Sequence, residues 1–222
     1  MNMEIRNIKL DNDFEVLYVD GLDGGGLNHL PDFLSVITNH GKDKYQNALE
    51  WCAGFGVIGF DFLNKGLCER MEFMDCYEPA IRWLNRTIEH NNVENKTATY
   101  HADKISLIPE GVKWDLVLAN PPHSFDLSTK KYFEETVRTP QLDDIIRITC
   151  DVDLEIHREF FNNIRTYLEP GADIFISEVG FLDEVQQLAE DAGLLFVDKH
   201  PAPTLSRDSK TDAVIFHFKE PQ

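Results

Sequence analysis

The chain has 222 residues, enough for one domain with a full apolar core, and it carries a formal net charge of −18 at pH 7. Because this excess of carboxylates repels phosphate backbones, we expect nucleic acid to be a disfavoured partner. The sequence offers no CxxC pair, no metal-ligand spacing, no signal peptide and no membrane-spanning apolar run, so we expect a cytoplasmic protein without disulfides, a metal site or a membrane partner.

We predict that residues 1–45 form a cap segment ahead of a main domain at residues 46–222. Within the cap, the glycine-rich stretch Gly21–Gly26 is typical of a turn, and we expect it to close over a ligand of the main domain. A helix is expected to begin at Pro31, because proline is favoured in a first helical turn and apolar residues follow it at helical spacing. Two alternating stretches of the cap predict strands, at Ile5–Leu10 and Phe14–Val19.

From Gln46 onward, strand-length apolar runs alternate with amphipathic helical stretches, a pattern that predicts parallel strands joined by crossover helices. The predicted strands are Ala48–Cys52, Met71–Cys76, Thr97–His101, Lys113–Ala119, Ala172–Val179, Leu194–Lys199 and Ala213–Phe218. The predicted helices are Val57–Asn64, Pro79–Asn91, Leu154–Leu168 and Leu182–Ala192. Only a loop separates the last two strands, so the final strand should be antiparallel. We therefore expect an α/β fold, Rossmann-like and doubly wound, with a mostly parallel seven-stranded sheet and an antiparallel last strand.

An irregular stretch of mixed charge interrupts this pattern at residues 123–153. It is too long for an ordinary connection between a strand and a helix. Because it follows directly after a strand end, where open α/β sheets bind ligands, we predict that it is a lid over the site.

The sequence DLVLANPPH, at Asp115–His123, places a polar side chain where a strand must stop. Pro121 and Pro122 cannot continue the strand, so Asn120 is held at its carboxyl end. The Asn carboxamide oxygen and a backbone carbonyl freed by the prolines can accept two hydrogen bonds from an NH₂ group, while the ring of His123 stacks on its plane. We interpret the motif as a pocket for a planar amine or amide; the alternative is a plain turn.

A second motif, EWCAGFGVIG, contains a GxGxxG pattern made by Gly54, Gly56 and Gly59 between a strand and a helix. Glycines at such a turn let a ligand approach the backbone, although a plain turn or a dinucleotide site fits the same pattern. Glu50 lies before these glycines, where a carboxylate opposes a pyrophosphate but attracts an amino group and a sulfonium. The acid therefore favours S-adenosylmethionine as the ligand.

Two further acids lie at the ends of the next two strands. Asp75 offers two oxygens in one plane, which suits the two hydroxyls of a ribose. Asp103 follows the third strand and can accept a hydrogen bond from an adenine amine, although aspartate is also a common turn residue. Together with Glu50, these acids describe a nucleoside site at one edge of the sheet, without a phosphate site.

These motifs together resemble the class I S-adenosylmethionine-dependent methyltransferases. They are most similar to the branch with an Asn-Pro-Pro-aromatic signature, which includes protein glutamine methyltransferases and adenine amino methyltransferases. The resemblance runs from Asn47 to Phe218, and the stretch LEPGADIFISEVGFLDEVQQLAEDAGLLFVDKH is similar in rhythm to the fifth strand, helix and sixth strand of that branch.

The resemblance implies a role for each matching residue. The glutamate and glycines would hold the methionine part of the cofactor, and the aspartates would hold its ribose and adenine. The implied cofactor-binding residues are Glu50, Cys52, Gly54, Gly56, Asp75, Cys76, Asp103 and Asn120. The implied catalytic residues, which orient and stack on the acceptor nitrogen, are Asn120, Pro121, Pro122 and His123.

Two of these residues depart from the branch pattern. Cys52 lies where the family often has its first glycine, and His123 lies where Tyr or Phe is usual, so a titratable ring replaces a neutral one. The helical domain that glutamine methyltransferases carry ahead of the catalytic domain is also absent, so we do not expect release-factor recognition in that style.

We therefore expect an N-methyltransferase that uses S-adenosylmethionine to methylate a planar amide or amino nitrogen of a small molecule or protein side chain. Hydrogen bonds from the acceptor NH₂ to Asn120 and to the Pro121 carbonyl would raise electron density on the nitrogen, and no strong base is required. One alternative is a nucleic-acid (RNA or DNA) adenine amino methyltransferase. Another is a non-catalytic methyltransferase-fold subunit acting through a partner, and a dinucleotide oxidoreductase is a minor option.

Overall fold

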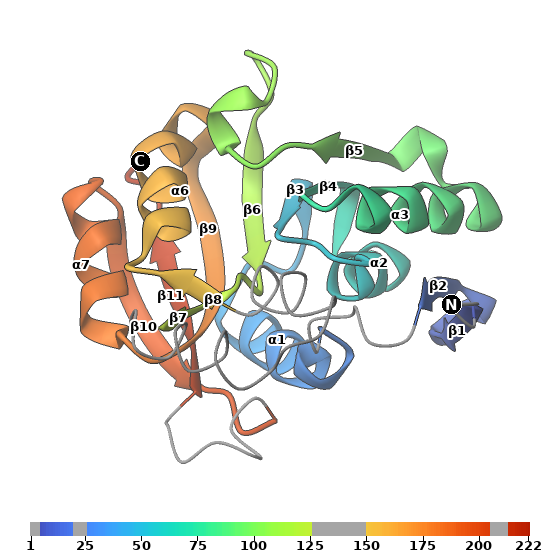
Figure 1. The fold of residues 1–222 in the computed structure, drawn as a ribbon, viewed down its shortest axis with the longest axis horizontal. Coiled ribbons are helices and arrows are strands. Elements are labelled where there is room, and N and C mark those ends of the chain that lie inside the picture. Colours follow the sequence, from blue (N-terminus) through green and yellow to red (C-terminus); the bar gives the residue numbers. More distant parts are fainter. Residues whose placement is uncertain (1–4, 20–25, 126–149, 205–212) are drawn as a thin grey trace, which may run out of the picture.

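A seven-stranded sheet forms the centre of the computed structural model (Figure 1). Its strands are β3 (Tyr45–Trp51), β4 (Cys68–Asp75), β5 (Thr97–His101), β6 (Trp114–Ala119), β9 (Leu168–Val179), β10 (Leu195–Pro201) and β11 (Ala213–Lys219). Their spatial order is β10-β11-β9-β6-β3-β4-β5. The pairs β3–β4, β3–β6, β4–β5 and β6–β9 are parallel, whereas β11 pairs antiparallel with both β9 and β10. The predicted α/β fold, with its mostly parallel sheet and antiparallel last strand, is confirmed.

The structure describes residues 5–19, 26–125, 150–204 and 213–222. Two predictions fall on residues outside these ranges. The closure over the ligand is predicted for the glycine-rich stretch, of which only Gly26 is described, and residues 126–149 form the central part of the predicted lid. Within the described ranges, no helix combines the length and the apolar character needed to cross a membrane.

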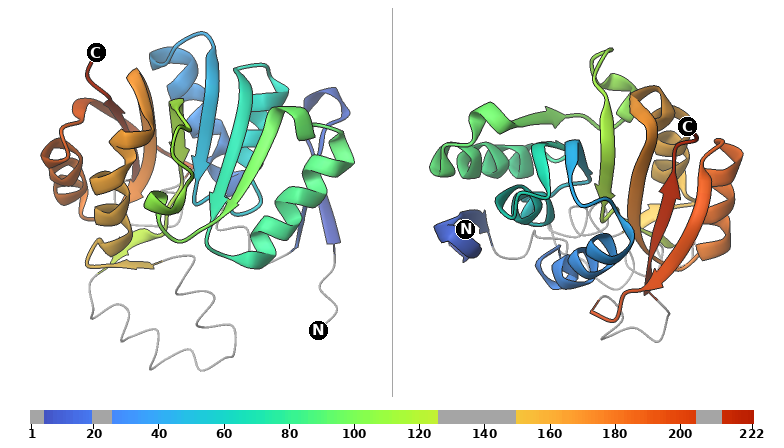
Figure 2. Two further views of the ribbon diagram at one scale, coloured as in Figure 1. Left: turned by 90° about the horizontal axis from the view of Figure 1, so that it is seen from above. Right: turned by 180° about the vertical axis from the view of Figure 1, so that it is seen from behind.

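Helices cover both faces of the sheet (Figures 1 and 2). One face carries α1 (Gly26–His40), α2 (Val57–Asn64) and α3 (Glu78–Asn91), and the other carries α6 (Glu155–Ile164) and α7 (Leu182–Asp191). Strand β6 supplies both cores by simple alternation, because Leu116 and Leu118 pack on the first face while Val117 and Ala119 pack on the second. Short 3₁₀ helices lie at Asp11–Asp13, Glu94–Lys96, Ile105–Leu107 and Arg165–Tyr167.

The amino-terminal segment packs onto the main domain in two places. A hairpin of β1 (Ile5–Lys9) and β2 (Glu15–Val19) lies against α3, where the Leu17 backbone N–H donates to Thr87 Oγ1 at 3.0 Å. Helix α1 packs beside α2 in the first core. The division between a cap at residues 1–45 and a domain at 46–222 stays a prediction.

Three predicted element ends differ from the observed ones by four or five residues: the start of α1, the end of α6 and the start of β9. Helix α1 begins at Gly26 and contains Pro31 within it, although the Pro31 nitrogen cannot donate to the Leu27 carbonyl and its ring crowds that carbonyl. The helix predicted to reach Leu168 ends as α6 at Ile164, and β9 already begins at Leu168, which pairs with Trp114 of β6 before a register shift.

A buried polar cluster joins three strands of the sheet. The Asp173 carboxylate of β9 is fully buried and accepts hydrogen bonds from the Tyr45 hydroxyl at 2.9 Å and from His217 Nε2 at 2.8 Å. Lys219 Nζ lies 3.3 Å away. Burial alone would raise the pKa of Asp173, but these contacts outweigh it and hold the pKa below its ordinary value. The ionised carboxylate therefore stabilises the folded chain.

We predict that Asp173→Asn lowers the free energy of unfolding by about 1–3 kcal/mol at pH 7, because it weakens the acceptor for buried donors. A depressed carboxyl pKa stabilises the fold above the unfolded pKa, and this stabilisation is lost as the pH falls through the folded pKa. The cost of the substitution should therefore shrink at pH 3. Urea unfolding at both pH values, with exposed Glu169→Gln as the control, measures it; an equal cost at both would contradict the assignment.

Candidate active site

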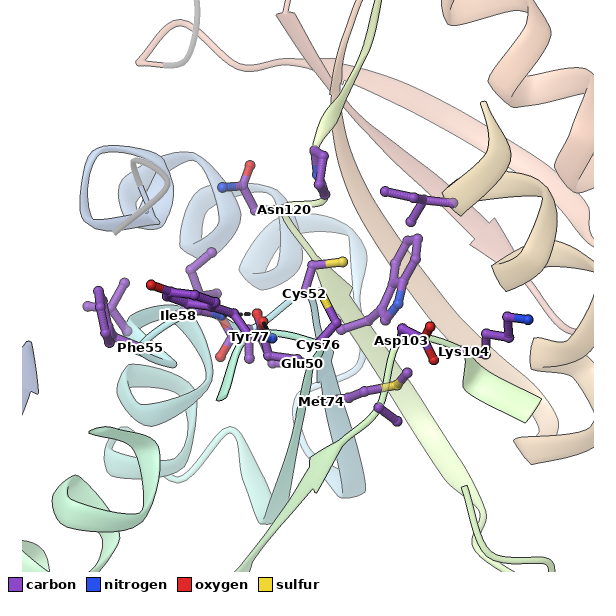
Figure 3. Close-up of a pocket in the computed structure, with 18 of the residues that line it drawn as sticks. Glu50, Cys52, Phe55, Ile58, Met74, Cys76, Tyr77, Asp103, Lys104 and Asn120 are labelled. Atoms are coloured by element: carbon purple, nitrogen blue, oxygen red, sulfur yellow. Dashed lines mark hydrogen bonds between the residues drawn. The ribbon is translucent and has the colours of Figure 1, made fainter. Parts of the chain in front are cut away.

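A cavity of about 370 Å³ opens at the carboxyl ends of β3, β4, β5 and β6 (Figure 3). Its size is within the range of small-molecule sites, about 300–1,000 Å³. The parallel strands bring residues that are far apart in sequence to this cavity, as expected at the carboxyl ends of strands in an open α/β sheet. The sequence-predicted residues that line the cavity are Glu50, Cys52, Gly54, Asp75, Cys76, Asp103, Asn120 and Pro122.

The loop after β3 has three residues in the left-handed backbone region. Cys52 has φ of 56°, at the position where the resemblance leads us to expect a glycine. Gly54 has φ of 53°, and a Cβ added there would meet no atom within 4 Å. A Cβ on Gly56, whose φ is 73°, would lie 2.5 Å from Leu84 Cδ2 and 2.8 Å from Phe73 Cε1. Gly54 therefore leaves open space at the cavity, whereas Gly56 lies outside the lining and permits close packing.

These two glycines make a matched pair for mutation. We predict that Gly54→Ala lowers stability by about 1–2 kcal/mol, the cost of a left-handed alanine alone. Gly56→Ala adds a clash with the core and should lower stability by roughly 3–5 kcal/mol. Urea unfolding of both variants measures the difference, and equal losses would show that the packing around Gly56 relaxes freely.

Glu50 lies at the base of the cavity and is only 3% exposed. Its Oε2 accepts the Gly59 backbone N–H at 2.8 Å, in the first turn of α2. Burial raises the pKa of Glu50 to about 8, and the charge of Asp75 adds to this, although the N–H groups of Gly59 and Ile58 oppose it. In the absence of a ligand, Glu50 is mostly protonated at neutral pH, and a cation in the cavity would favour its ionised form.

We predict that Glu50→Gln stabilises the ligand-free chain at pH 8.5 by roughly 1–3 kcal/mol and changes it little at pH 5. A raised carboxyl pKa contributes stability below the unfolded pKa, and this stability is lost as the pH rises toward 8. Glutamine does not titrate and can still accept from Gly59. Urea unfolding at both pH values checks the prediction, with exposed Glu89→Gln as the control; a variant that is less stable at pH 8.5 would contradict it.

Asp75 joins the loops that follow β3 and β4. Its Oδ2 accepts the Gly54 N–H at 2.8 Å, and its Oδ1 accepts the Tyr77 N–H at 2.7 Å. These two contacts fix the orientation of the Asp75 carboxylate. Cys76 is exposed beside it, and its carbonyl oxygen lies 3.2 Å from His101 Nε2.

Asp103 and Lys104 lie at the opposite end of the cavity from Phe55 and Ile58, as Figure 3 shows. The first turns of α6 complete this end. Glu159 of α6 accepts the Ile105 N–H at 3.0 Å and the Ser106 hydroxyl at 3.0 Å, which fixes the loop after β5.

Several lining residues are not among those that the sequence predicts, and they come from α6, the amino-terminal hairpin, α1 and the glycine loop. The α6 acids have a visible signal, since they are four residues apart on the polar face of a predicted helix, whereas the apolar ones have none beyond ordinary strand and helix patterns. The missed residues include Ile8, Tyr18, Leu27, Phe55, Glu155, Ile156 and Glu159.

The Asn-Pro-Pro-His motif leaves the sheet at the end of β6. Asn120 lines the cavity, and its Oδ1 accepts a hydrogen bond from the buried Ser177 hydroxyl at 2.6 Å. Pro122 also lines the cavity, while Pro121 is buried outside the lining. His123 lies beyond the lining and begins β7 (His123–Phe125), which pairs in parallel with β8 (Cys150–Val152).

The charges around the cavity are strongly unbalanced. Among the described lining residues Lys104 is the one basic side chain, so the field in the cavity favours a cation and opposes a phosphate. The acidic lining residues are Glu50, Asp75, Asp103, Glu155 and Glu159.

Comparison with known proteins gives one family. The family model of the methyltransferase small domain matches residues 27–139, just over half of the chain. No curated protein matches the chain significantly in sequence.

Solved structures with the same fold are distant in sequence. A candidate RNA methyltransferase from Pyrococcus horikoshii has 12% identity and a TM-score of 0.58, over 87% of this chain and 83% of that one. Trm5 of Methanocaldococcus jannaschii, in complex with adenosine, has 16% identity and a TM-score of 0.59, over 100% of this chain and 58% of that one. The ribosomal protein L11 methylase of Lactobacillus delbrueckii subsp. bulgaricus has 10% identity and a TM-score of 0.56, over 85% and 76%. These likenesses show a common fold.

Proposed function

This chain belongs to the methyltransferase small domain family, and we propose that it transfers a methyl group from S-adenosylmethionine to a planar amide or amino nitrogen of a small molecule or protein side chain. Members of the family use S-adenosylmethionine, so the enzyme class follows from family membership. One observation carries the finer proposal: Asn120 lies on the same cavity as the strand-end carboxylates.

The chemistry of the cavity fits this cofactor. S-adenosylmethionine presents a sulfonium cation, an ammonium group, two ribose hydroxyls and an adenine amine, all of which are cations or hydrogen-bond donors. Glu50, Asp75 and Asp103 are acceptors of matching character on three successive strand ends, and Gly54 leaves its backbone open to a ligand. We assign the methionine part to Glu50 and Gly54, the ribose to Asp75 and the adenine to Asp103. When bound, the cofactor supplies an electrophilic methyl group.

Asn120 is the residue to which we assign recognition of the acceptor nitrogen. Ser177 donates to its Oδ1 and so fixes the carboxamide, and an amide oxygen has a second lone pair that can accept from an NH₂ group. The Pro121 carbonyl is the second acceptor that we propose. Two such hydrogen bonds draw the nitrogen lone pair out of conjugation and hold the nitrogen in place, which lowers a barrier by about 7 kcal/mol when orientation is near ideal.

The charge of the chain favours acceptors without phosphate. The net charge of −18 and the acidic lining of the cavity both oppose a nucleic-acid backbone. Among structural neighbours, the Pyrococcus horikoshii protein is named as a candidate RNA methyltransferase and the Lactobacillus delbrueckii protein as a ribosomal protein methylase, so the fold alone does not choose between these acceptors. We therefore base the choice on charge.

Labelled methyl transfer to a panel of acceptors tests the proposal. The panel contains a glutamine peptide, a primary arylamine, adenosine and a single-stranded RNA. We expect transfer to one of the first three, with a rate that depends little on salt between about 50 and 200 mM. Binding of an RNA substrate, and therefore transfer to it, would fall steeply over that range. Exclusive, salt-sensitive transfer to the RNA would overturn our choice of acceptor, and failure to bind S-adenosylhomocysteine in calorimetry would overturn the cofactor assignment.

We predict that Asn120→Ala lowers kcat by roughly 100-fold or more, because it removes a hydrogen bond that strengthens in the transition state. The affinity for S-adenosylhomocysteine should change by less than about threefold, since cofactor recognition rests mainly on the carboxylates. Exposed Asn162→Ala on α6 is the control for the loss of an asparagine. Wild-type kcat in Asn120→Ala would remove Asn120 from the mechanism.

A further inference from the structure

A chain of four ionisable side chains lies behind the Asn-Pro-Pro-His motif, one from each of β7, β8, α6 and β9. His157 Nδ1 lies 2.7 Å from Asp151 Oδ2, and His157 Nε2 lies 3.1 Å from Glu178 Oε2. The other Glu178 oxygen, Oε1, lies 3.4 Å from His123 Nδ1. These contacts form a continuous chain from Asp151 to the last residue of the motif.

The inner part of this chain is fixed by the backbone. Asp151 accepts the N–H groups of Ile156 and His157, both at 3.0 Å, and so holds the first turn of α6. Glu178 Oε1 also accepts the Val179 N–H at 2.7 Å. Both carboxylates are at most 1% exposed. Neither can turn away from the histidines without giving up hydrogen bonds from buried or partly buried backbone N–H groups.

The buried histidine, His157, has a raised pKa. Burial would lower this pKa, but the hydrogen bond to Asp151 and the close contact with the Glu178 carboxylate outweigh burial and raise it to about 9. Burial would likewise raise the pKa of Glu178, but the two histidines lower it to about 2. The Glu178 carboxylate therefore lies between His157 and His123 in its ionised form.

The Glu178 carboxylate facing His123 bears on the tautomer of its ring. Its Nδ1 is buried against Glu178, whereas the side chain as a whole is 20% exposed, so the exposed part lies away from Nδ1. A carboxylate facing Nδ1 favours the proton on that nitrogen, and the neutral ring then has its lone pair on Nε2. Among the described residues, the ionisable groups on this side of His123 are Glu178 and the His157–Asp151 pair behind it, and Cys150 is its neighbour in the β7–β8 register.

Two simpler interpretations explain the chain less well. No group of three or more His, Cys, Asp and Glu side chains in the described part is arranged to hold a metal ion. A purely structural ion pair is costly to bury, and this chain of four side chains does not end in the core. It ends at His123, one residue beyond Pro122, which lines the cavity. Its position therefore suggests a role in the reaction.

We propose that Asp151, His157 and Glu178 position His123 with its proton on Nδ1, so that His123 Nε2 accepts the proton released by the methylated nitrogen. The inference rests on the proposed function. As the N–H bond of the product breaks, its electron pair stays on nitrogen, and the Nε2 lone pair forms the new N–H bond. His123 becomes an imidazolium beside Glu178 and later loses the proton to water. The acceptor must therefore have a nitrogen that carries a hydrogen.

Nitrogen-15 shifts of the His123 ring in the ligand-free protein test the tautomer without any activity. The signals are assigned by their absence in His123→Phe and recorded where the ring is neutral. We expect a protonated Nδ1 and a bare Nε2 in the wild type, and at least a threefold shift toward the Nε2-protonated form in Glu178→Gln. A wild-type ring protonated on Nε2, or a tautomer unchanged in Glu178→Gln, would overturn the proposal.

Kinetics test the proton transfer, with the acceptor that the panel identifies. His123→Phe keeps an aromatic ring, so we expect an S-adenosylhomocysteine affinity within about threefold of wild type but a kcat lower by about 10- to 100-fold. Asp173→Asn, which removes a buried carboxylate paired with a histidine elsewhere, should keep the wild-type kcat.

The outcomes separate this proposal from the proposed function. Methyl transfer by the wild type together with an unchanged kcat in His123→Phe would overturn the role of His123 and leave the function intact. Binding of S-adenosylhomocysteine without transfer to any acceptor would overturn both. Asp151→Asn serves as the second variant if Glu178→Gln does not fold, and it should shift the His123 tautomer in the same direction.

Discussion

Parallel pairing of β3, β4, β5 and β6 is the constraint on which the rest of the structure depends, because it brings four strand ends to one edge of the sheet. Each strand ends on a residue that carries an acceptor or is followed by one, so negative charge gathers in one cavity. Two features reduce the repulsion between these carboxylates: the raised pKa of Glu50 favours its neutral form, and Asp75 accepts hydrogen bonds from backbone N–H groups. A cationic ligand relieves the same repulsion, which links the stability of the free protein to what the cavity binds.

Most of the sheet could be predicted from the sequence because local patterns determine it. Apolar alternation gives the strands, and the short link before Ala213 gives the antiparallel end. The pattern did not show that β11 lies between β9 and β10, since strand order depends on contacts between distant segments. It also misplaced the start of α1, because proline is typical of a first helical turn, whereas Pro31 lies inside this helix.

The site also contains residues that the sequence predicts and residues that it does not. Glu50, Asp75, Asp103 and Asn120 were visible because each follows from a strand end and a parallel sheet. The separate functions of Gly54 and Gly56 were not visible, because only the packing of Leu84 and Phe73 distinguishes them. The chain behind His123 also could not be predicted, since it joins β7, β8, α6 and β9 through side chains with no common motif.

A crystal structure of the protein with S-adenosylhomocysteine tests the central claim most directly, since it shows both halves of the site at once. The account predicts the nucleoside across the carboxyl ends of β3, β4 and β5, with its ribose at Asp75 and its adenine at Asp103, and an open space beside the Asn120 carboxamide. A nucleoside bound elsewhere, or an Asn120 side chain turned away from the bound molecule, would contradict it.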